Sequence, residues 1–102
     1  MGFQDLLRQA QQMRERMQRL QEELGSRTVE GSAGGGMVVA VVNGRQELLD
    51  LRIDREVVDP GEVGMLRDLV RAAVNDALAR SREMAAAEMA KITGGMLPPG
   101  IF

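Results

Sequence analysis

The sequence contains no cysteine, histidine, tryptophan or tyrosine, and these absences exclude several kinds of chemistry. Without cysteine, the chain can form neither a disulfide framework nor a cysteine-based metal site. Without histidine and cysteine, it lacks the most common general base and the thiol nucleophile. Its serines and threonines have no recognisable activating partner by spacing. We therefore expect a protein that is not an enzyme and that uses no metal, no cofactor and no small-molecule substrate.

Aromatic residues are nearly absent as well, since Phe3 and Phe102 are the only two. The core must therefore consist of Leu, Val, Ile, Ala and Met, without the large buried area that an aromatic ring brings. A chain of 102 residues corresponds to one modest core, so we expect a single domain over residues 1–102. Pairing with a second copy would add buried surface that so small a domain lacks.

A long apolar run is also missing. The longest stretch without a charged residue, residues 31–44, is half glycine and other small residues. A helix that crosses a bilayer needs about 20 mostly apolar residues. No segment has the pattern of an export signal. We expect a cytoplasmic protein with no membrane partner.

Two motifs that bind ligands in other proteins are incomplete here. Gly34-Gly35-Gly36 is followed by neither the Lys-Ser/Thr pair nor the helix of a phosphate-binding loop. The acidic residues Asp50, Asp54, Glu56 and Asp59 lack the spacing and the central glycine of a calcium loop. We interpret the first motif as a flexible connection and the second as a solvated strand face followed by a turn.

Residues 3–24 show the first regular pattern, which predicts one uninterrupted helix that ends at Gly25. Its apolar residues recur at alternating intervals of three and four, the heptad pattern of a coiled coil. They are Phe3, Leu6, Ala10, Met13, Met17, Leu20 and Leu24. Because this stripe is narrow, the helix can meet only one partner helix. That partner is either the distal end of a second helix in the same chain or a helix of another copy.

Residues 26–54 predict a three-stranded antiparallel meander. A weak strand at 27–30 precedes a glycine-rich connection, and the continuous apolar run at 37–42 suggests a strand buried on both faces. The pair Asn43-Gly44 is a strong hairpin signal, because both residue types tolerate positive φ. The stretch 47–54 alternates, with Leu49, Leu51 and Ile53 on one face.

A second helix is predicted over residues 62–92. Its first half has a broad apolar face that can lie across the sheet, whereas its second half has the profile of a helix leaving the core. Gly94-Gly95 ends it, and residues 93–102 form a flexible tail. The element order is therefore α-β-β-β-α, an α+β fold.

Charge gives an ambiguous signal. The net charge of −2 counts against a nucleic-acid ligand, yet residues 1–20 carry four arginines against two acidic residues. Arg8, Arg16 and Arg19 share one side of the predicted helix. Glu15 precedes Arg19 by four residues, the favourable spacing for a local ion pair. The residues alone leave two interpretations open, a self-compensated solvated face and a face that binds a polyanion.

Six stretches follow one another along almost the whole chain: Gln-Ala-Gln-Gln-Met at 9–13, Leu-Gln-Glu-Glu at 20–23, the glycine-rich turn into 37–44, Leu-Arg-Ile-Asp at 51–54, Leu-Val-Arg-Ala-Ala-Val-Asn-Asp-Ala at 69–77, and Gly-Gly-Met-Leu-Pro-Pro-Gly at 94–100. Each one is a weak signal, but in this order and spacing they resemble the YbaB/EbfC family of bacterial nucleoid-associated proteins. The resemblance implies a homodimer, open to higher assembly, whose helical arms project from a core of sheets and helices. It also implies a nucleoid location and binding of double-stranded DNA with little sequence preference.

The resemblance attributes the DNA-contacting surface to the first and last helices. The basic residues at those positions are Arg8, Arg14, Arg16, Arg19, Arg80, Arg82 and Lys91. We expect them to contact mainly phosphates, because no stretch has the pattern of a known base-reading helix. The alternative is an adaptor that holds proteins of the replication, recombination or membrane-insertion machinery and contacts DNA only incidentally. The glutamine-rich, charge-balanced first helix favours this alternative.

Overall fold

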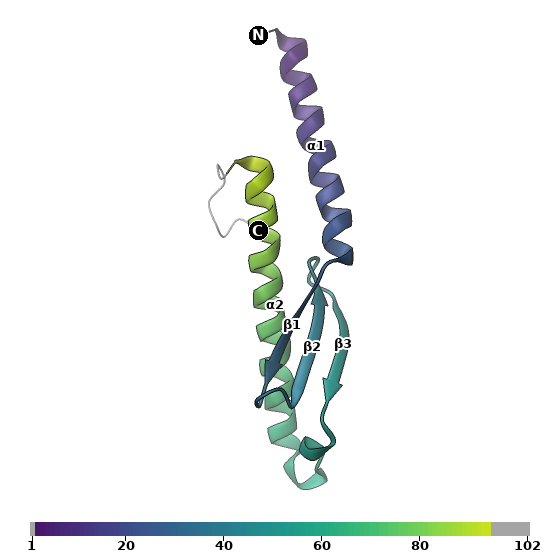
Figure 1. The fold of residues 1–102 in the computed structure, drawn as a ribbon, viewed down its shortest axis with the longest axis vertical. Helices are drawn as coiled ribbons and strands as arrows, with labels where there is room; N and C mark the ends of the chain where they lie inside the picture. The colour runs from purple at the N-terminus through teal and green to yellow at the C-terminus, as the bar shows by residue number, and fades with distance from the viewer. Residues whose placement is uncertain (1, 95–102) are drawn as a thin grey trace.

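The computed structural model describes residues 2–94, so the predicted tail 93–102 lies outside them except for its first two residues, of which Thr93 belongs to the last helix. The elements in chain order are α1 (Phe3–Ser26), β1 (Thr28–Ala33), β2 (Val38–Asn43), β3 (Leu48–Ile53), the 3-10 turns η1 (Arg55–Val57) and η2 (Pro60–Glu62), and α2 (Val63–Thr93). The predicted α+β class and element order are confirmed (Figure 1). Neither helix in this part of the chain is long and apolar enough to span a bilayer.

The first helix, α1, does not end at Gly25 as predicted but continues to Ser26. The chain then turns into an extended conformation at Arg27, whose N–H donates to the Glu23 carbonyl at 3.1 Å. No left-handed residue ends the helix. Gly25 instead lies under the side chain of Arg45, because a Cβ added at Gly25 would sit 3.2 Å from the Arg45 Cδ.

The sheet is antiparallel in the order β1-β2-β3. β1 runs on through Gly31 to Ala33, which places half of the predicted glycine-rich connection inside a strand. Close packing explains this, since a Cβ at Gly31 would lie 2.1 Å from the Ala77 backbone nitrogen of α2. The connection between the strands is Gly34–Met37, so the second strand begins one residue later than predicted. The three glycines of this turn have positive φ, where glycine carries no steric penalty.

The hairpin between β2 and β3 begins at Asn43-Gly44 as predicted, but its loop is longer than the two-residue turn that this pair suggests. The Asn43 carbonyl accepts from the Gln46 N–H at 3.2 Å, and the positive φ of 67° falls on Gln46. This is the geometry of a three-residue loop. Gly44 has a different role: its N–H donates to the Leu24 carbonyl at 2.8 Å, and a Cβ there would lie 2.7 Å from the Leu24 side chain. The hairpin therefore packs on the end of α1.

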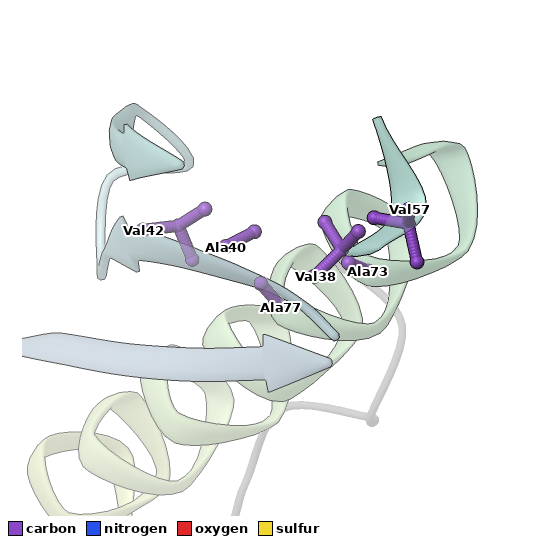
Figure 2. Close-up of a cluster of buried hydrophobic side chains, with 6 residues drawn as sticks. All are labelled: Val38, Ala40, Val42, Val57, Ala73 and Ala77. Carbon is purple, nitrogen blue, oxygen red and sulfur yellow. The ribbon is translucent and has the colours of Figure 1, made fainter. Parts of the chain in front are cut away.

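The core lies between the sheet and the first half of α2. Figure 2 shows Val38, Ala40 and Val42 of β2 with Ala73 and Ala77 of α2, all five fully buried; Val57 closes one end of the cluster. The prediction that β2 is buried on both faces is wrong, because one helix covers only one face of the sheet. The alternate side chains Val39 and Val41 are half-buried on the other face.

On β3, the predicted apolar face is only partly used. Leu51 packs on the core, whereas Leu49 and Ile53 are exposed. A register shift between Val41 and Val42 adds one residue to β3, and this strand forms the edge of the sheet. Its apolar side chains therefore extend past the reach of α2.

A second cluster joins α1 to the distal half of α2 in the same chain. Leu20, Leu24 and Met89 are its buried members, and Met17, Met84, Ala85 and Ile92 pack against them. The C-terminal half of the predicted stripe thus has the distal end of the second helix as its partner. The N-terminal half of α1 extends past the end of α2 with its apolar side chains exposed (Figure 1). The molecule measures 70 × 22 × 16 Å, and its radius of gyration of 18.8 Å exceeds the ~13 Å of a compact chain of this length.

Candidate nucleic-acid interface

Four of the predicted DNA-contacting residues, Arg16, Arg19, Arg82 and Lys91, lie around the junction of α1 and α2. Here the two helices run in opposite directions and meet along a seam formed by Leu20, Leu24 and Met89 (Figure 1). A cleft borders this seam on each side, and different side chains of both helices line the two clefts. Four of the seven predicted residues therefore lie on the two flanks of this two-helix arm, and Arg8, Arg14 and Arg80 line neither cleft.

The first cleft, here named the Lys91 flank, has a volume of about 280 Å³. Its lining residues are Arg16, Arg19, Leu20, Glu23, Glu88, Lys91 and Ile92. It brings together three of the predicted residues, Arg16 and Arg19 from α1 and Lys91 from α2. Two carboxylates, Glu23 and Glu88, share the cleft with them.

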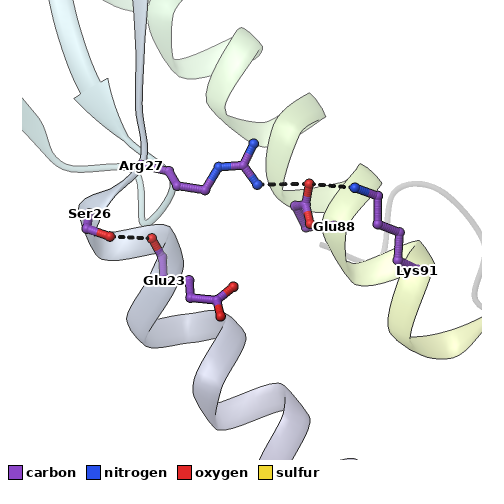
Figure 3. A network of polar contacts seen from close by, with 5 residues as sticks. All are labelled: Glu23, Ser26, Arg27, Glu88 and Lys91. Carbon is purple, nitrogen blue, oxygen red and sulfur yellow. Dashed lines mark hydrogen bonds and ion pairs between the residues drawn. The ribbon is translucent and has the colours of Figure 1, made fainter.

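Glu88 is the centre of a small ion-pair network on this flank. Its Oε1 lies 2.8 Å from the Arg27 guanidinium and 3.0 Å from the Lys91 ammonium (Figure 3). The hydrogen bond from Arg27 is the main reason that the pKa of Glu88 lies below its ordinary value, and the bond from Lys91 adds to it. Lys91 is therefore partly neutralised, and the network ties the start of β1 to α2.

The second cleft, here named the Arg45 flank, has a volume of about 370 Å³. Its lining residues are Gln21, Leu24, Gly44, Arg45, Gln46, Arg82, Ala85 and Met89. Its wall is mostly apolar, its two charged residues are both arginines, and no acidic residue lines it. Of the predicted residues it contains only Arg82. The sequence analysis missed Arg45, because that residue stands in a hairpin and only the fold brings it to the arm.

Arg80 lies apart from both clefts. Its Nε is 3.2 Å from Asp76 Oδ2, and the same carboxylate oxygen accepts a hydrogen bond from the Ser32 N–H at 3.1 Å. The hydrogen bond from the Ser32 N–H is the main reason that the pKa of Asp76 lies below its ordinary value, and Arg80 makes a smaller contribution. Arg80 thus supports the contact between α2 and β1 instead of joining the other predicted residues.

Arg8 and Arg14 lie on the exposed N-terminal half of α1. The predicted ion pair between Glu15 and Arg19 is not formed in the structure. Within residues 2–94, the four arginines of α1 have no ion pair at all. The interpretation of this helix as self-compensated therefore loses its main support.

The acidic residues of the middle segment have local roles. Asp54 accepts from the Glu56 N–H and caps η1, and Asp59 accepts from the Gly61 N–H and caps η2, both at 2.9 Å. On the sheet, Arg52 pairs with Glu30 and Asp50. No group of side chains suited to hold a metal ion occurs in the described part of the chain.

Fold and interface together define an elongated α+β protein with a two-helix arm, in which the arginines of α1 form no ion pair within residues 2–94. Residues 1–96 match the YbaB/EbfC DNA-binding family, so this chain belongs to that family. The predicted family is thereby confirmed. The family is one of DNA-binding proteins, which agrees with the expectation that the chain is not an enzyme.

Individual relatives agree with this assignment. A nucleoid-associated protein of Syntrophobacter fumaroxidans is 57% identical over 95 residues, which cover 93% of this chain and 86% of the relative. A nucleoid-associated protein of Caldanaerobacter subterraneus is 57% identical over 98 residues, covering 96% and 88% of the two chains. Among solved structures, an uncharacterized protein of Helicobacter pylori matches with a TM-score of 0.76 at 26% identity, over 96% of this chain and 99% of that one.

Proposed function

We propose that this chain is a nucleoid-associated protein that binds double-stranded DNA through arginines on its helical arm, mainly by phosphate contacts and with little sequence preference. One observation carries this proposal. The four arginines of α1 form no ion pair within residues 2–94, so their guanidinium groups are available to a ligand. Guanidinium groups suit phosphate well, because their planar fork donates two parallel hydrogen bonds.

The segregation of charge supports the same conclusion. In the body of the molecule, which consists of the sheet, the 3-10 turns and the first half of α2, several acidic side chains already have partners. They form ion pairs on the sheet or cap the 3-10 turns. The basic excess is confined to residues 1–20, which carry four arginines against two acidic residues, and this part of α1 can attract a polyanion although the net charge of the chain is −2. The local field of such a segment, and not the net charge, sets the encounter with DNA.

We further propose that the protein works as a homodimer. Leu48 and Leu49 on the edge strand β3, Val58 after η1, and Val63 and Met65 at the start of α2 are all exposed. They follow one another along β3 and the chain beyond it, from the hairpin beside α1 to the opposite end of the molecule at the start of α2 (Figure 1). An open strand edge with exposed apolar side chains is a surface that proteins normally cover. A second copy would cover it and leave two arms free.

Fluorescence anisotropy with a duplex of about 20–30 base pairs, measured over a series of salt concentrations, tests DNA binding. If the two arms neutralise about 4–6 phosphates, log affinity should fall with log salt with a slope of about −4 to −5. Replacing Arg8, Arg16 and Arg19 together by Ala should lower both affinity and slope.

The matched control replaces Arg52, Arg67 and Arg71 by Ala. It removes the same formal charge from residues that are ion-paired and lie outside the arm. This control should bind nearly as the parent protein does. Absence of binding at low salt, or binding that does not respond to salt, would overturn the proposal.

A second candidate is the protein adaptor, favoured by the uncovered apolar side chains Phe3, Leu6 and Met13 on α1. Under this function the arm would hold a protein partner in a defined ratio. A complex of fixed stoichiometry that survives nuclease treatment, and that is lost when Leu6 and Met13 become Ser, would favour it. A complex that nuclease dissolves would favour DNA.

A further inference from the structure

We propose that Arg45 and Arg82 form a second phosphate-binding site, on the flank of the arm opposite to Arg16, Arg19 and Lys91. This inference rests on the proposed binding of DNA. It adds a contact from the β2–β3 hairpin to a surface otherwise made by the two helices.

The two flanks differ in the charge of their linings. Three basic residues on the Lys91 flank stand against two carboxylates. On the Arg45 flank, two arginines stand against none. Arg14 extends this side along the arm, since it precedes the lining residue Gln21 by seven residues, about two helical turns. The Arg45 flank is therefore the more favourable place for an anion.

No contact of the Arg45 side chain indicates that this residue is needed to stabilise the fold. Its position over Gly25, in the last turn of α1, suits a cation that caps helix carbonyls. Those carbonyls already have other donors, however. The Leu24 carbonyl accepts from the Gly44 N–H at 2.8 Å, and the Gly25 carbonyl accepts from Asn43 Nδ2 at 3.1 Å. Neither the Arg45 nor the Arg82 guanidinium has a hydrogen bond or ion pair within residues 2–94.

The site is preorganised, because hydrogen bonds hold the hairpin. Asn43 is 3% exposed, and its Oδ1 accepts from the Arg45 N–H at 2.9 Å and the Glu47 N–H at 3.0 Å. Ser81 of α2 donates to the Asn43 carbonyl and accepts from Gln46 Nε2, both at 2.7 Å. The backbone of Arg45 is therefore fixed relative to α2 before any ligand arrives, which lowers the entropic cost of binding.

The lining of the cleft suits a nucleotide unit of a DNA backbone. Leu24, Ala85 and Met89 provide an apolar surface, against which the carbon face of a deoxyribose can pack. The two guanidinium groups can donate to the phosphate beside it. The cleft volume of about 370 Å³ lies within the ~300–1,000 Å³ typical of ligand sites.

The double variant Arg45→Gln with Arg82→Gln tests this site in the salt titration described above. Loss of two phosphate contacts should reduce the steepness of the salt dependence by about 2 and weaken binding at least about tenfold at low salt. The matched control, Arg67→Gln with Arg71→Gln, removes two arginines of α2 that pair with Asp68. It should leave the slope nearly unchanged.

Two further measurements exclude a purely structural effect. The midpoint of thermal unfolding should be the same for the double variant and the parent. The conservative variant Arg45→Lys with Arg82→Lys should restore the slope and only part of the affinity, because lysine keeps the charge but loses the planar fork. If the Gln variant binds like its control, the second site is wrong while DNA binding stands. If the parent protein does not bind DNA, both proposals fail.

Discussion

Asp76 shows how one side chain can fasten a helix to a sheet edge. Its carboxylate accepts the Ser32 N–H of the edge strand β1 and pairs with Arg80 one helical turn further along α2. Both interactions favour the ionised form and lower the pKa of the carboxyl group, the Ser32 N–H having the larger effect. The same carboxylate occupies an N–H of an edge strand, a type of group that otherwise invites pairing with another chain.

The lowered pKa of Asp76 predicts a pH dependence of folding. A carboxyl whose pKa is lower in the folded state stabilises the protein above its unfolded pKa, and this contribution disappears as pH falls through the folded pKa. The difference in unfolding free energy between the parent and Asp76→Asn should therefore be constant from about pH 7 to about pH 5 and shrink below about pH 4. Urea unfolding across this range measures it. A difference that does not vary with pH would contradict the prediction.

At the scale of elements, two glycines allow close contacts that no other residue permits. Gly44 lets the hairpin approach the end of α1, and Gly31 lets β1 approach α2. At Gly31 an added Cβ would lie 2.6 Å from the Ala77 Cα and 2.7 Å from the Ala73 carbonyl oxygen. These are backbone atoms, so the helix itself would have to move. The distance between sheet and α2 is therefore set by a residue without a side chain.

Gly31→Ala should destabilise the protein by at least about 1–3 kcal/mol, the usual penalty for overpacking a filled core. Urea unfolding measures this loss. Gly64→Ala is the matched control, because it lies in the first turn of α2 and its Cβ would meet only the end of the Arg67 side chain at 3.7 Å. There alanine should be neutral or stabilising by up to about 1 kcal/mol. Equal stability of the two variants would show that β1 and α2 pack less tightly than the structure indicates.

At the scale of the whole molecule, the body and the arm expose different surfaces. The body exposes apolar side chains along β3 and the start of α2, and the arm exposes arginines on both flanks of its seam. Under the proposed function, the first surface joins two copies and the second meets DNA. The molecule extends over 70 Å, with the start of α2 at one end and the N-terminal half of α1 at the other, and the two surfaces meet at the hairpin before β3 (Figure 1).

Replacing Leu49 and Val58 by Glu should convert the proposed dimer to a monomer, because two charges would be buried in the interface without partners. Light scattering coupled to size exclusion should then show one chain of 11.1 kDa instead of two. Leu6→Glu, which changes an exposed residue of the arm, is the control and should leave the dimer intact. A parent protein that already runs as a monomer would contradict the prediction.

The sequence predicted the class and order of the elements because each element has its own periodicity. The heptad stripe of α1 and the broad apolar face of α2 were both recognisable, and the structure packs Leu20 against Met89 as two such helices require. The bounds were less predictable. Gly25 looks like a helix end and Gly31 like part of a loop, but each is a contact point with a distant element.

The candidate site, too, has features that the sequence predicts and features that only the fold determines. The basic excess of residues 1–20 follows from the sequence, and so does the lack of histidine and cysteine. The partners of each charge do not, because ion pairs depend on which residues the fold brings within about 4 Å. Arg80 and Lys91 pair within their own helix, with Asp76 four residues and Glu88 three residues away, whereas the pair between Arg27 and Glu88 requires the tertiary fold. Tertiary packing also places Arg45, a hairpin residue, beside the two helices of the arm. The sequence could not predict this position, because it does not show which distant segments lie side by side.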